Sequence, residues 1–306
     1  MILERQDWVQ VFAPAKINLT LHVTGQREDG YHLLDSLVVF ADIGDSLLLR
    51  PGNGFSLKTE GPEAAGVPDG KGNLVLRVAD LFPEISGASV VLTKNLPVAS
   101  GIGGGSADAA AAVRGLVTLQ GNRDFVPDFS DPALAPMAKR LLEMGADIPM
   151  CLMSSAARVG GVGEQIALLP DWPETHAVLV NPRRALATPS VFKALRQRIN
   201  APMPATIPKF ASVDEMAEWL SEQRNDLEAA ACGLEPQIAI AKTVLNAQPA
   251  CLLARMSGSG ATCFGLFADR NGADRAAAAI SLAYPDWWVQ AVRLGTQTVR
   301  ALPQVR

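Results

Sequence analysis

A glycine-rich segment between Leu96 and Val113 is the part of the sequence best suited to bind a phosphate. Four of the five residues from Gly101 to Gly105 are glycine, and an alanine-rich stretch follows them directly. Glycine lets the backbone approach a ligand and adopt positive φ, and the first N–H groups of a helix have no internal partners and lie at its positive end. Because each unneeded glycine costs about 0.5–1 kcal/mol of backbone entropy, this density favours an anion-binding loop over a plain turn.

The loop matches neither of the standard nucleotide-binding motifs. A Walker A loop ends in Gly-Lys-Ser/Thr, whereas this one ends in Gly-Gly-Ser106-Ala107. A Rossmann fingerprint requires a second strand that closes on an acidic residue, but Asp124 follows Gln-Gly-Asn-Arg. The sequence therefore predicts phosphate binding and leaves the class of ligand open.

Two other segments place charged side chains where chemistry could use them. Lys16 and Asn18 stand two residues apart in a stretch that alternates from Ala15 onward like a half-buried strand, so we expect them on the same side of it. Asp147 stands among small and apolar residues just before Pro149, where an unpaired carboxylate is costly. Each has a plainer interpretation, a solvated strand lysine and a turn or cap aspartate. If the fold brings Lys16 and Asp147 together, they form a catalytic pair.

An aromatic pair is a further candidate for ligand binding. Tyr31 and His32 close the polar turn that begins at Gly25, and both side chains could stack on a flat ligand or form hydrogen bonds with it. Packing of the same rings on the core is an equally good interpretation.

The elements predicted around the loop give the order strand, glycine loop, helix. Asn73 is a suitable N-cap for the helix that precedes them. We expect mostly antiparallel strands before the loop, including a strand pair within 45–60 that is interrupted at 51–54. The predicted elements of this half are strands over 15–23, 33–41 and 88–94, helices over 74–82, 109–119 and 132–144, and a loop over 122–131.

The second half of the chain has the α+β pattern of a sandwich domain. A domain boundary is expected near residue 160, which gives domains of residues 1–160 and 161–306. Thr188 is expected to cap a helix whose first residue is Pro189. The remaining elements are strands within 156–181, a Pro-rich linker over 200–212, helices over 213–223, from 225 past Pro236 and over 273–283, and strands up to 268 and over 286–293.

Composition excludes several classes of function. The 306 residues are 48% hydrophobic with a formal net charge of −4, and the longest basic run is Arg183-Arg184, so the charge pattern does not favour nucleic-acid binding. Four cysteines lack CxxC spacing and three histidines lack i, i+4 pairing, which argues against a zinc site. No signal peptide or apolar run of about 18 residues is present. We expect a cytoplasmic protein with a small-molecule ligand and no membrane partner.

Four motifs in order along nearly the whole chain resemble the GHMP kinase superfamily. They are Pro14–Leu19 with Gly30–His32, the glycine loop Pro97–Ala110, Gly145–Pro149 and Ser257–Ala261. The first of them is similar to the branch that phosphorylates a cytidine diphosphate-linked methylerythritol in the non-mevalonate pathway to isoprenoids. The resemblance implies a two-domain α+β fold, with an N-terminal domain similar to the second domain of a small-subunit ribosomal protein and a C-terminal α/β sandwich.

The same resemblance implies roles for individual residues. The activity implied is ATP-dependent phosphorylation of the tertiary 2-hydroxyl of that substrate, with Asp147 as base or orienting carboxylate and Lys16 as its cationic neighbour. The implied ATP-binding residues are Asn73, Pro97, Ala99, Ser100, Gly101, Ile102, Gly103, Gly104, Gly105 and Ser106. The implied substrate-binding residues are Asn18, Tyr31, His32, Asp147, Thr188, Phe192, Gly258 and Gly260.

Within this implied site the two ligands occupy opposite ends. Adenine is expected beside the Asn73 segment, and cytosine between the rings of Tyr31 and Phe192 with His32 at its edge. Asn18 lies near the reacting groups, Thr188 and Asp147 line the methylerythritol end, and Gly258 and Gly260 shape the substrate side of the cleft.

The glycine loop departs from the commonest pattern of the family. Ala99-Ser100 stands where glycines are frequent, and Ala107 stands where a second serine is frequent. Mg²⁺ is expected to bind together with ATP, and the Ser106 hydroxyl is the one candidate ligand for the ion in this segment. No carboxylate ligand is assigned, so the metal site stays open.

Three other functions are compatible with parts of the pattern. A homoserine- or mevalonate-type kinase shares the glycine loop, and an inactive member of the superfamily could act as a ligand sensor, although both Lys16 and Asp147 are present. A ribosomal-protein-like sandwich would require a basic surface for RNA. The expected oligomeric state is a monomer or a weak homodimer.

Overall fold

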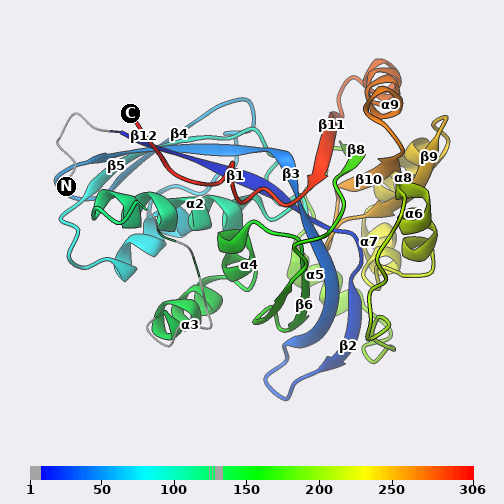
Figure 1. Cartoon of the computed structure of the whole chain (residues 1–306), viewed down its shortest axis with the longest axis horizontal. Helices are drawn as coiled ribbons and strands as arrows, with labels where there is room; N and C mark the ends of the chain where they lie inside the picture. Colours follow the sequence, from blue (N-terminus) through cyan, green and yellow to red (C-terminus); the bar gives the residue numbers. More distant parts are fainter. Residues whose placement is uncertain (1–7, 124, 126, 128–133) are drawn as a thin grey trace.

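The computed structural model describes residues 8–123, 125, 127 and 134–306, and the strands of these residues join in one sheet (Figure 1). The main path through the sheet is β12-β1-β3-β11-β8-β10-β9, with β2, β4, β5, β6 and β7 attached beside it. The strands are β1 Val9–Asn18, β2 His22–Gln26, β3 His32–Pro51, β4 Ser56–Glu60, β5 Ala88–Thr93, β6 Ala157–Gly161, β7 Gln165–Leu168, β8 Thr175–Asn181, β9 Cys251–Met256, β10 Cys263–Phe267, β11 Trp288–Gly295 and β12 Gln304–Val305.

The helices flank this sheet at both ends. They are α1 Leu74–Arg77, α2 Gly104–Leu119, α3 Ala135–Met144, α4 Ile148–Met153, α5 Thr188–Ala194, α6 Val213–Ser221, α7 Glu228–Leu234, α8 Gln237–Asn246 and α9 Arg270–Ala283, with short 3₁₀ turns at Gly70–Gly72 and Val78–Leu81. Over the residues that the structure describes, we find no helix with the length and apolar character that crossing a membrane requires.

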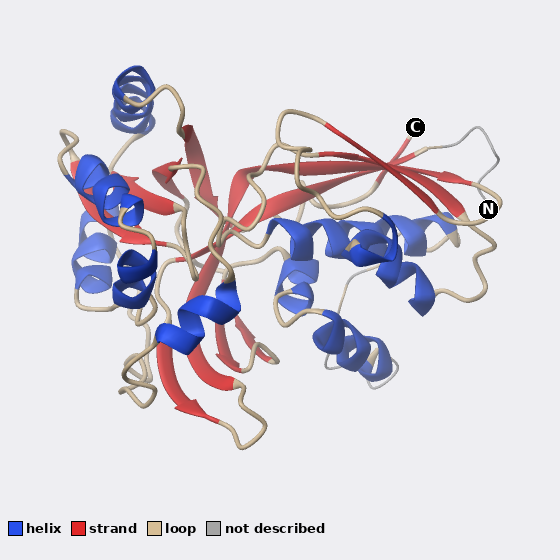
Figure 2. Cartoon of the chain, turned by 180° about the vertical axis from the view of Figure 1, so that it is seen from behind, coloured by secondary structure: helices blue, strands red, loops and turns tan. Residues whose placement is uncertain are grey.

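Strand β3 connects the two ends of the molecule. It is 20 residues long, and it pairs with β1, β2, β5, β6 and β11. Residues 36–41 of this strand are all buried, as expected where both faces of a sheet are covered. Figures 1 and 2 show it running from the layer over α2 to the hairpin that it forms with β2.

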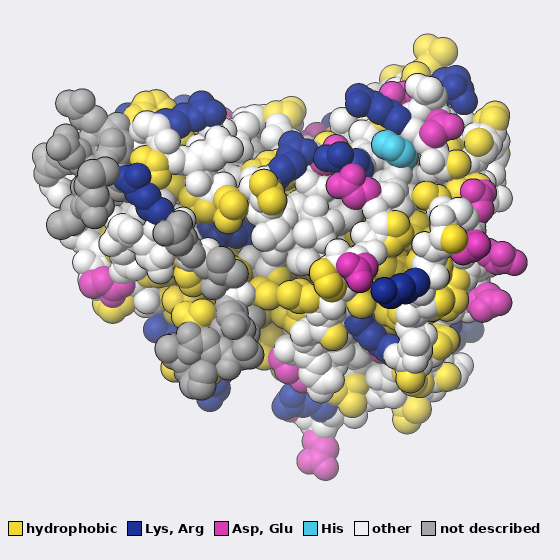
Figure 3. Space-filling view, in the orientation of Figure 1, with side chains coloured by type: hydrophobic (Ala, Val, Ile, Leu, Met, Phe, Trp, Pro, Cys, Tyr) yellow, Lys and Arg dark blue, Asp and Glu magenta, His cyan; other side chains and the backbone are white. Residues whose placement is uncertain are grey.

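Helix α2 covers one face of the N-terminal part of the sheet (Figure 2). Its residues Ala109–Ala112 are fully buried and belong to the same core cluster as Val11 and Leu47. Alanine has the highest helix propensity and a small side chain, so this run both favours the helix and lets it lie close to the strands. At the other end, α8 and α9 pack on β8–β11 around a second cluster. On the face shown in Figure 3, basic and acidic side chains are intermixed.

Several sequence predictions agree with the structure. Strand β5, helix α2 after the glycine loop, the strands within 156–181 and the last strand are present, and the Asn73 side chain accepts a hydrogen bond from the Val75 N–H at the start of α1. Part of the predicted loop over 122–131, Asp124 and the first residues of the helix over 132–144 lie outside the described residues.

The predicted strand pair within 45–60 is wrong. Strand β4 does not pair with β3; it runs parallel to β5, which lies between them and is antiparallel to β3. The physical reason is burial: Val90 and Leu92 of β5 are buried, whereas β4 alternates between exposed and half-buried residues. The more polar strand therefore takes the edge position.

The predicted half-buried strand over 15–23 is also wrong in two respects. The strand stops at Asn18 and resumes at His22, and the polar side chains Lys16, Asn18, Thr20 and His22 are buried together with the apolar ones. The C-terminal part of the chain interrupts the strand between Asn18 and His22: Arg255 donates a hydrogen bond to the Leu19 carbonyl, and Leu21 pairs with the chain near Asn225.

Two helix boundaries differ from the prediction. The helix expected from residue 225 past Pro236 is two helices, because a proline cannot donate its backbone hydrogen bond inside a helix, and Pro236 instead is the N-cap of α8. The N-cap of α5 is Ala187, so Thr188 and Pro189 are its first two residues. The Thr188 hydroxyl is hydrogen-bonded to the Ser259 hydroxyl, at 2.7 Å, and does not cap the helix.

Candidate active site

A cleft of about 1110 Å³ lies where the glycine loop, β1, α4 and α5 meet. Most of the residues singled out from the sequence line it, together with Gln26, Asp29, Lys94, Asp108, Lys193 and Arg198, which the sequence did not indicate. Those that line it are Lys16, Asn18, Tyr31, His32, Asn73, Pro97, Ala99, Ser100, Gly101, Gly103, Gly104, Gly105, Ser106, Asp147, Thr188, Phe192 and Gly258. Ile102 and Gly260 are not among the lining residues.

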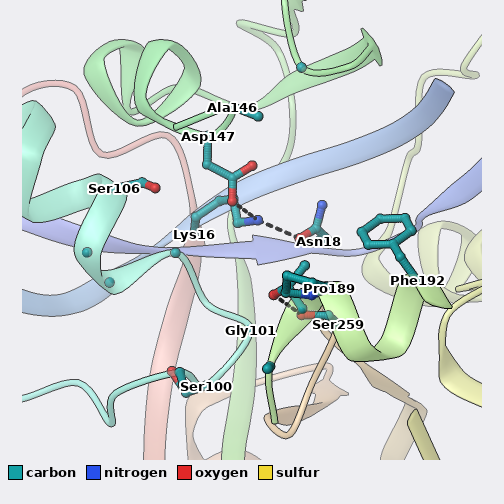
Figure 4. Close-up of a pocket in the computed structure, with 18 of the residues that line it drawn as sticks. Lys16, Asn18, Ser100, Gly101, Ser106, Ala146, Asp147, Pro189, Phe192 and Ser259 are labelled. Carbon is teal, nitrogen blue, oxygen red and sulfur yellow. Dashed lines mark hydrogen bonds and ion pairs between the residues drawn. The ribbon is translucent and has the colours of Figure 1, made fainter. Parts of the chain in front are cut away.

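Lys16 and Asp147 meet in this cleft (Figure 4). The Lys16 ammonium donates a hydrogen bond to Asp147 Oδ2 at 2.9 Å and another to Asn18 Oδ1 at 2.8 Å. The Lys16 side chain is 6% exposed, while that of Asp147 is 37% exposed and faces the cleft. The side chain of Asn18 is fixed in turn, because its amide donates to the Ser36 hydroxyl at 2.7 Å. Lys16 is therefore a buried cation held between two acceptors, and the interpretation as a solvated edge lysine is wrong.

Local structure explains why the Asp147 carboxylate is available. Asp147 is the N-cap residue of α4, but its side chain accepts no capping hydrogen bond from that helix. An aspartate at the N-cap position commonly accepts a hydrogen bond from a backbone N–H of the first helical turn. In Asp147 the contact with Lys16 replaces this capping hydrogen bond. One oxygen thus pairs with the ammonium while the group remains partly open to the cleft.

The backbone of the glycine loop has the conformation that its composition predicts. Gly101 and Gly103 have φ of +76° and +68°, and Ala99 has φ of +51°, which is unusual for a residue with a side chain. Helix α2 begins at Gly104, so the N–H groups of Gly104, Gly105 and Ser106 have no hydrogen-bond acceptor within the helix. These three residues line the cleft. Amides at the positive end of a 16-residue helix are well suited to bind an anion.

A second small-residue loop supports the glycine loop from behind. A Cβ atom on Gly101 would lie 2.5 Å from the Gly260 carbonyl oxygen, so the two backbones are in direct contact. The Ser257 hydroxyl donates to the Gly101 carbonyl at 3.3 Å and accepts from the Asn18 N–H at 3.1 Å. Gly260 therefore contacts the loop and not the cleft, and the Ile102 carbonyl accepts from the Lys16 N–H on the buried side.

The aromatic residues are arranged around the mouth of the cleft. The His32 ring stacks on Phe192, with centroids 4.7 Å apart and planes inclined by 25°, while Tyr31 is 61% exposed. The Nε2 atom of His32 is buried and finds no hydrogen-bond partner among the residues that the structure describes. Burial lowers the pKa of His32, and the nearby Arg198 lowers it further. The imidazole is consequently neutral at pH 7 and has a free ring nitrogen for a ligand.

Replacing Arg198 tests this account of His32. Without the cation, the imidazolium form is less disfavoured, so the His32 pKa is expected to rise in Arg198→Gln while staying below that of an exposed histidine because burial remains. The His32 pKa can be followed by ¹H–¹³C NMR of the ring, since the sequence contains three histidines and a His32→Gln spectrum assigns the signal. An unchanged or lower His32 pKa in Arg198→Gln would contradict the electrostatic cause.

A buried charge cluster beneath the loop was missed by the sequence analysis. Lys94, Asp45 and Asp108 are each buried, and the Lys94 ammonium forms ion pairs with both carboxylates, at 2.9 Å for Asp108. Asp45 Oδ1 also accepts from the N–H groups of Asn95 and Leu96, which lead into the glycine loop. Burial raises the pKa of Asp108 well above its usual range, and Asp45 raises it further. The cluster joins β3, the residue that follows β5, and α2, directly below the first residue of α2.

The chain is similar to known proteins over most of its length. The family model described as GHMP kinases N terminal domain matches residues 73–155, and the model described as GHMP kinases C terminal matches residues 193–286. A relative from Roseobacter denitrificans, 4-diphosphocytidyl-2-C-methyl-D-erythritol kinase, is 56% identical over 297 residues, which cover 97% of each chain.

Solved structures of kinases share the fold of this chain. The crystal structure of a 4-(cytidine 5'-diphospho)-2C-methyl-D-erythritol kinase superimposes with a TM-score of 0.71 at 31% identity, covering 94% of this chain and 99% of the other. A homoserine kinase from Cytophaga hutchinsonii shares the fold, with a TM-score of 0.66 at 20% identity and coverage of 100% and 99%. The predicted α+β fold of the superfamily is confirmed. The chain belongs to the GHMP kinase family, whose members are small-molecule phosphotransferases with ATP as the phosphoryl donor.

Proposed function

We propose that this enzyme transfers the γ-phosphoryl group of ATP to the tertiary 2-hydroxyl of 4-diphosphocytidyl-2-C-methyl-D-erythritol, giving the 2-phosphate and ADP in the non-mevalonate pathway to isoprenoid precursors. The observation that carries the proposal is the Lys16–Asp147 ion pair, which lies in the same cleft as the free amides of α2. Relatives at 51–56% identity that are named 4-diphosphocytidyl-2-C-methyl-D-erythritol kinase support the choice of substrate.

The arrangement suits phosphoryl transfer, which depends mainly on positioning and on stabilising negative charge. The amides of Gly104, Gly105 and Ser106 would hold the triphosphate at the positive end of α2. Asp147 would accept the proton of the attacking hydroxyl, and Lys16 would orient that carboxylate. Asn18 would keep the Lys16 ammonium directed toward Asp147.

The residues of the cleft also suit Mg²⁺ bound together with ATP. In the part of the chain that the structure describes, we find no cluster of three or more His, Cys, Asp or Glu side chains able to hold a metal ion. Mg²⁺ at kinase sites keeps several waters and is bound by substrate phosphates with one or two carboxylates, so a dedicated cluster of protein ligands is not required. The Ser106 hydroxyl at the start of α2 is the group we propose for it. The ion would supply charge neutralisation at the transferring phosphoryl group.

At the other end of the cleft, the aromatic residues would recognise the cytosine. His32 has a neutral ring with a free nitrogen, and Phe192 and Tyr31 offer flat faces beside it. Thr188 would line the methylerythritol end, and the Asn73 segment would lie beside adenine. We retain two domains divided near residue 160, and a monomer or weak homodimer without nucleic-acid partners, as parts of this proposal.

The direct test is ADP release from ATP and Mg²⁺ with 4-diphosphocytidyl-2-C-methyl-D-erythritol, homoserine or mevalonate as acceptor. Turnover with the cytidylyl acceptor alone is expected. Turnover with homoserine or mevalonate but not with the cytidylyl compound would overturn the assignment, and binding of ATP without turnover of any acceptor would favour a ligand sensor.

Tyr31→Ala is expected to raise the KM for the cytidylyl substrate about tenfold with kcat within about twofold, because a stacking face is worth on the order of 1 kcal/mol and lies far from the reacting hydroxyl. Steady-state kinetics at saturating ATP measure both constants. Tyr31→Phe keeps the ring and is the matched control, for which KM should stay close to the wild-type value. A fall in kcat without a change in KM would rule out the stacking role.

A further inference from the structure

Helix α2, which lines the cleft at its N-terminus, also contacts α4 through a side chain further along. Arg114 stands ten residues after Gly104, about 15 Å further along the helix. Its Nη2 atom donates hydrogen bonds to the Cys151 carbonyl at 2.6 Å, the Leu152 carbonyl at 3.0 Å and the Ser154 hydroxyl at 2.6 Å. All three acceptors belong to the C-terminal end of α4.

Helix α4 is short enough for this contact to fix its other end. It spans Ile148–Met153, about 9 Å, and Asp147 is its N-cap residue. The Cys151 N–H donates to the Asp147 carbonyl at 3.0 Å, so one helical turn separates the acceptors of Arg114 from the carboxylate. Residues 148–152 are all buried, which leaves the turn little freedom to deform.

The contact between α2 and α4 is made by the buried, charged guanidinium of Arg114, although the stability of the fold does not require a charge there. Arg114 is 4% exposed, and burial lowers its pKa to about 10, so the guanidinium is still protonated at neutral pH. Its hydrogen bonds go to two carbonyls and a hydroxyl, and within the described part of the chain its Nη1 atom has no partner. Burying a charge on neutral acceptors is costly, whereas apolar side chains of similar volume could fill the same space.

We propose that Arg114 is a positioning residue for phosphoryl transfer, which holds α4 so that Asp147 is kept at a fixed distance from the phosphate-binding end of α2. This inference rests on the proposed role of Asp147. One rigid helix carries the phosphate amides at its start and the anchor of the carboxylate ten residues later. The segment of α2 from Gly104 to Arg114 would therefore set the distance between the bound phosphate and the carboxylate of Asp147.

The first test compares Arg114→Met with the wild type in steady-state kinetics. A misplacement of the base by about 1 Å can cost up to about a hundredfold in rate, so we expect kcat to fall by about 10- to 100-fold while the KM values for ATP and the cytidylyl substrate stay within about twofold. Arg114→Lys is expected to recover part of kcat. Thr118→Val is the matched control: it removes a buried side-chain hydrogen bond of α2, to the Arg114 carbonyl, without touching α4.

The second test asks whether Arg114 acts through Asp147. In a background of Asp147→Asn, measured with enzyme in excess and radiolabelled ATP, Arg114→Met should lower the rate no further. Ser154→Ala gives the same comparison if Arg114→Met does not fold, with an expected effect of about threefold in the wild type and none in Asp147→Asn. An unchanged kcat, or losses that multiply in the double variant, would overturn the inference. Absence of turnover by the wild type would overturn the proposed function on which it rests.

Discussion

Asp147→Asn is expected to lower kcat by about a thousandfold while both ligands still bind. The amide keeps the shape of the side chain and one acceptor for the Lys16 ammonium, but it cannot take the proton of the attacking hydroxyl. General-base catalysis contributes about 10²–10⁴-fold, and an orienting negative charge beside the hydroxyl is lost with it. Initial rates of ADP release give kcat, and calorimetric titration with ADP and with the cytidylyl substrate gives the two affinities.

Asp29→Asn is a suitable control for this experiment. Asp29 is another carboxylate of the same cleft, and its ion pair is with Arg27 at the exposed turn before Tyr31. The substitution removes the same charge without touching Lys16, so kcat should remain within about twofold of the wild type. Equal kcat values for Asp147→Asn and the wild type would refute the role of Asp147 as base or orienting carboxylate.

The candidate site was predictable where local sequence determines local structure. Glycine density and the helix start at Gly104 follow from backbone sterics, and the prediction of an anion-binding loop depends on nothing more distant. The pairing of Lys16 with Asp147 is different, because 131 positions separate them and no local rule joins them. There the ordered motifs of the superfamily supplied the information that spacing alone could not.

Ala99 shows that a residue can depart from a sequence motif and still have the backbone conformation that the motif implies. Its φ of +51° lies in the region that favours glycine, and an alanine there costs on the order of 1 kcal/mol. The surrounding loop imposes the conformation although the residue does not prefer it. A departure from the sequence pattern is therefore not a departure from the backbone geometry.

The features that could not be predicted depend on contacts between distant parts of the chain. The parallel pairing of β4 with β5 is decided by which strand buries more apolar surface, and the interruption of the strand after Asn18 is caused by the C-terminal half packing over it. Likewise, the sequence does not indicate Asp108 as a site residue, and only the fold shows that it shares Lys94 with Asp45.

Lys94→Met is expected to lower the free energy of unfolding by about 3–5 kcal/mol, because it leaves two buried carboxylates without their cation. Urea denaturation at pH 7 measures the loss. Lys58→Met is the control, since Lys58 pairs with Glu60 at the surface and should contribute about 1 kcal/mol at most. A loss for Lys94→Met as small as that of Lys58→Met would contradict the structural importance of the cluster.

The pH dependence of the same variant separates electrostatics from packing. Lys94 opposes the rise in the pKa of Asp108, so removing it raises that pKa further above the value of an unfolded aspartate. Above the unfolded pKa, the folded variant then binds more protons than the unfolded chain, and its stability falls as the pH rises. The deficit of Lys94→Met relative to the wild type should therefore shrink between pH 8 and pH 5, and adding Asp108→Asn should remove most of this dependence. A deficit that stays constant with pH would assign the loss to packing, in which case the Lys94 side chain supports the glycine loop by its volume and not by its charge.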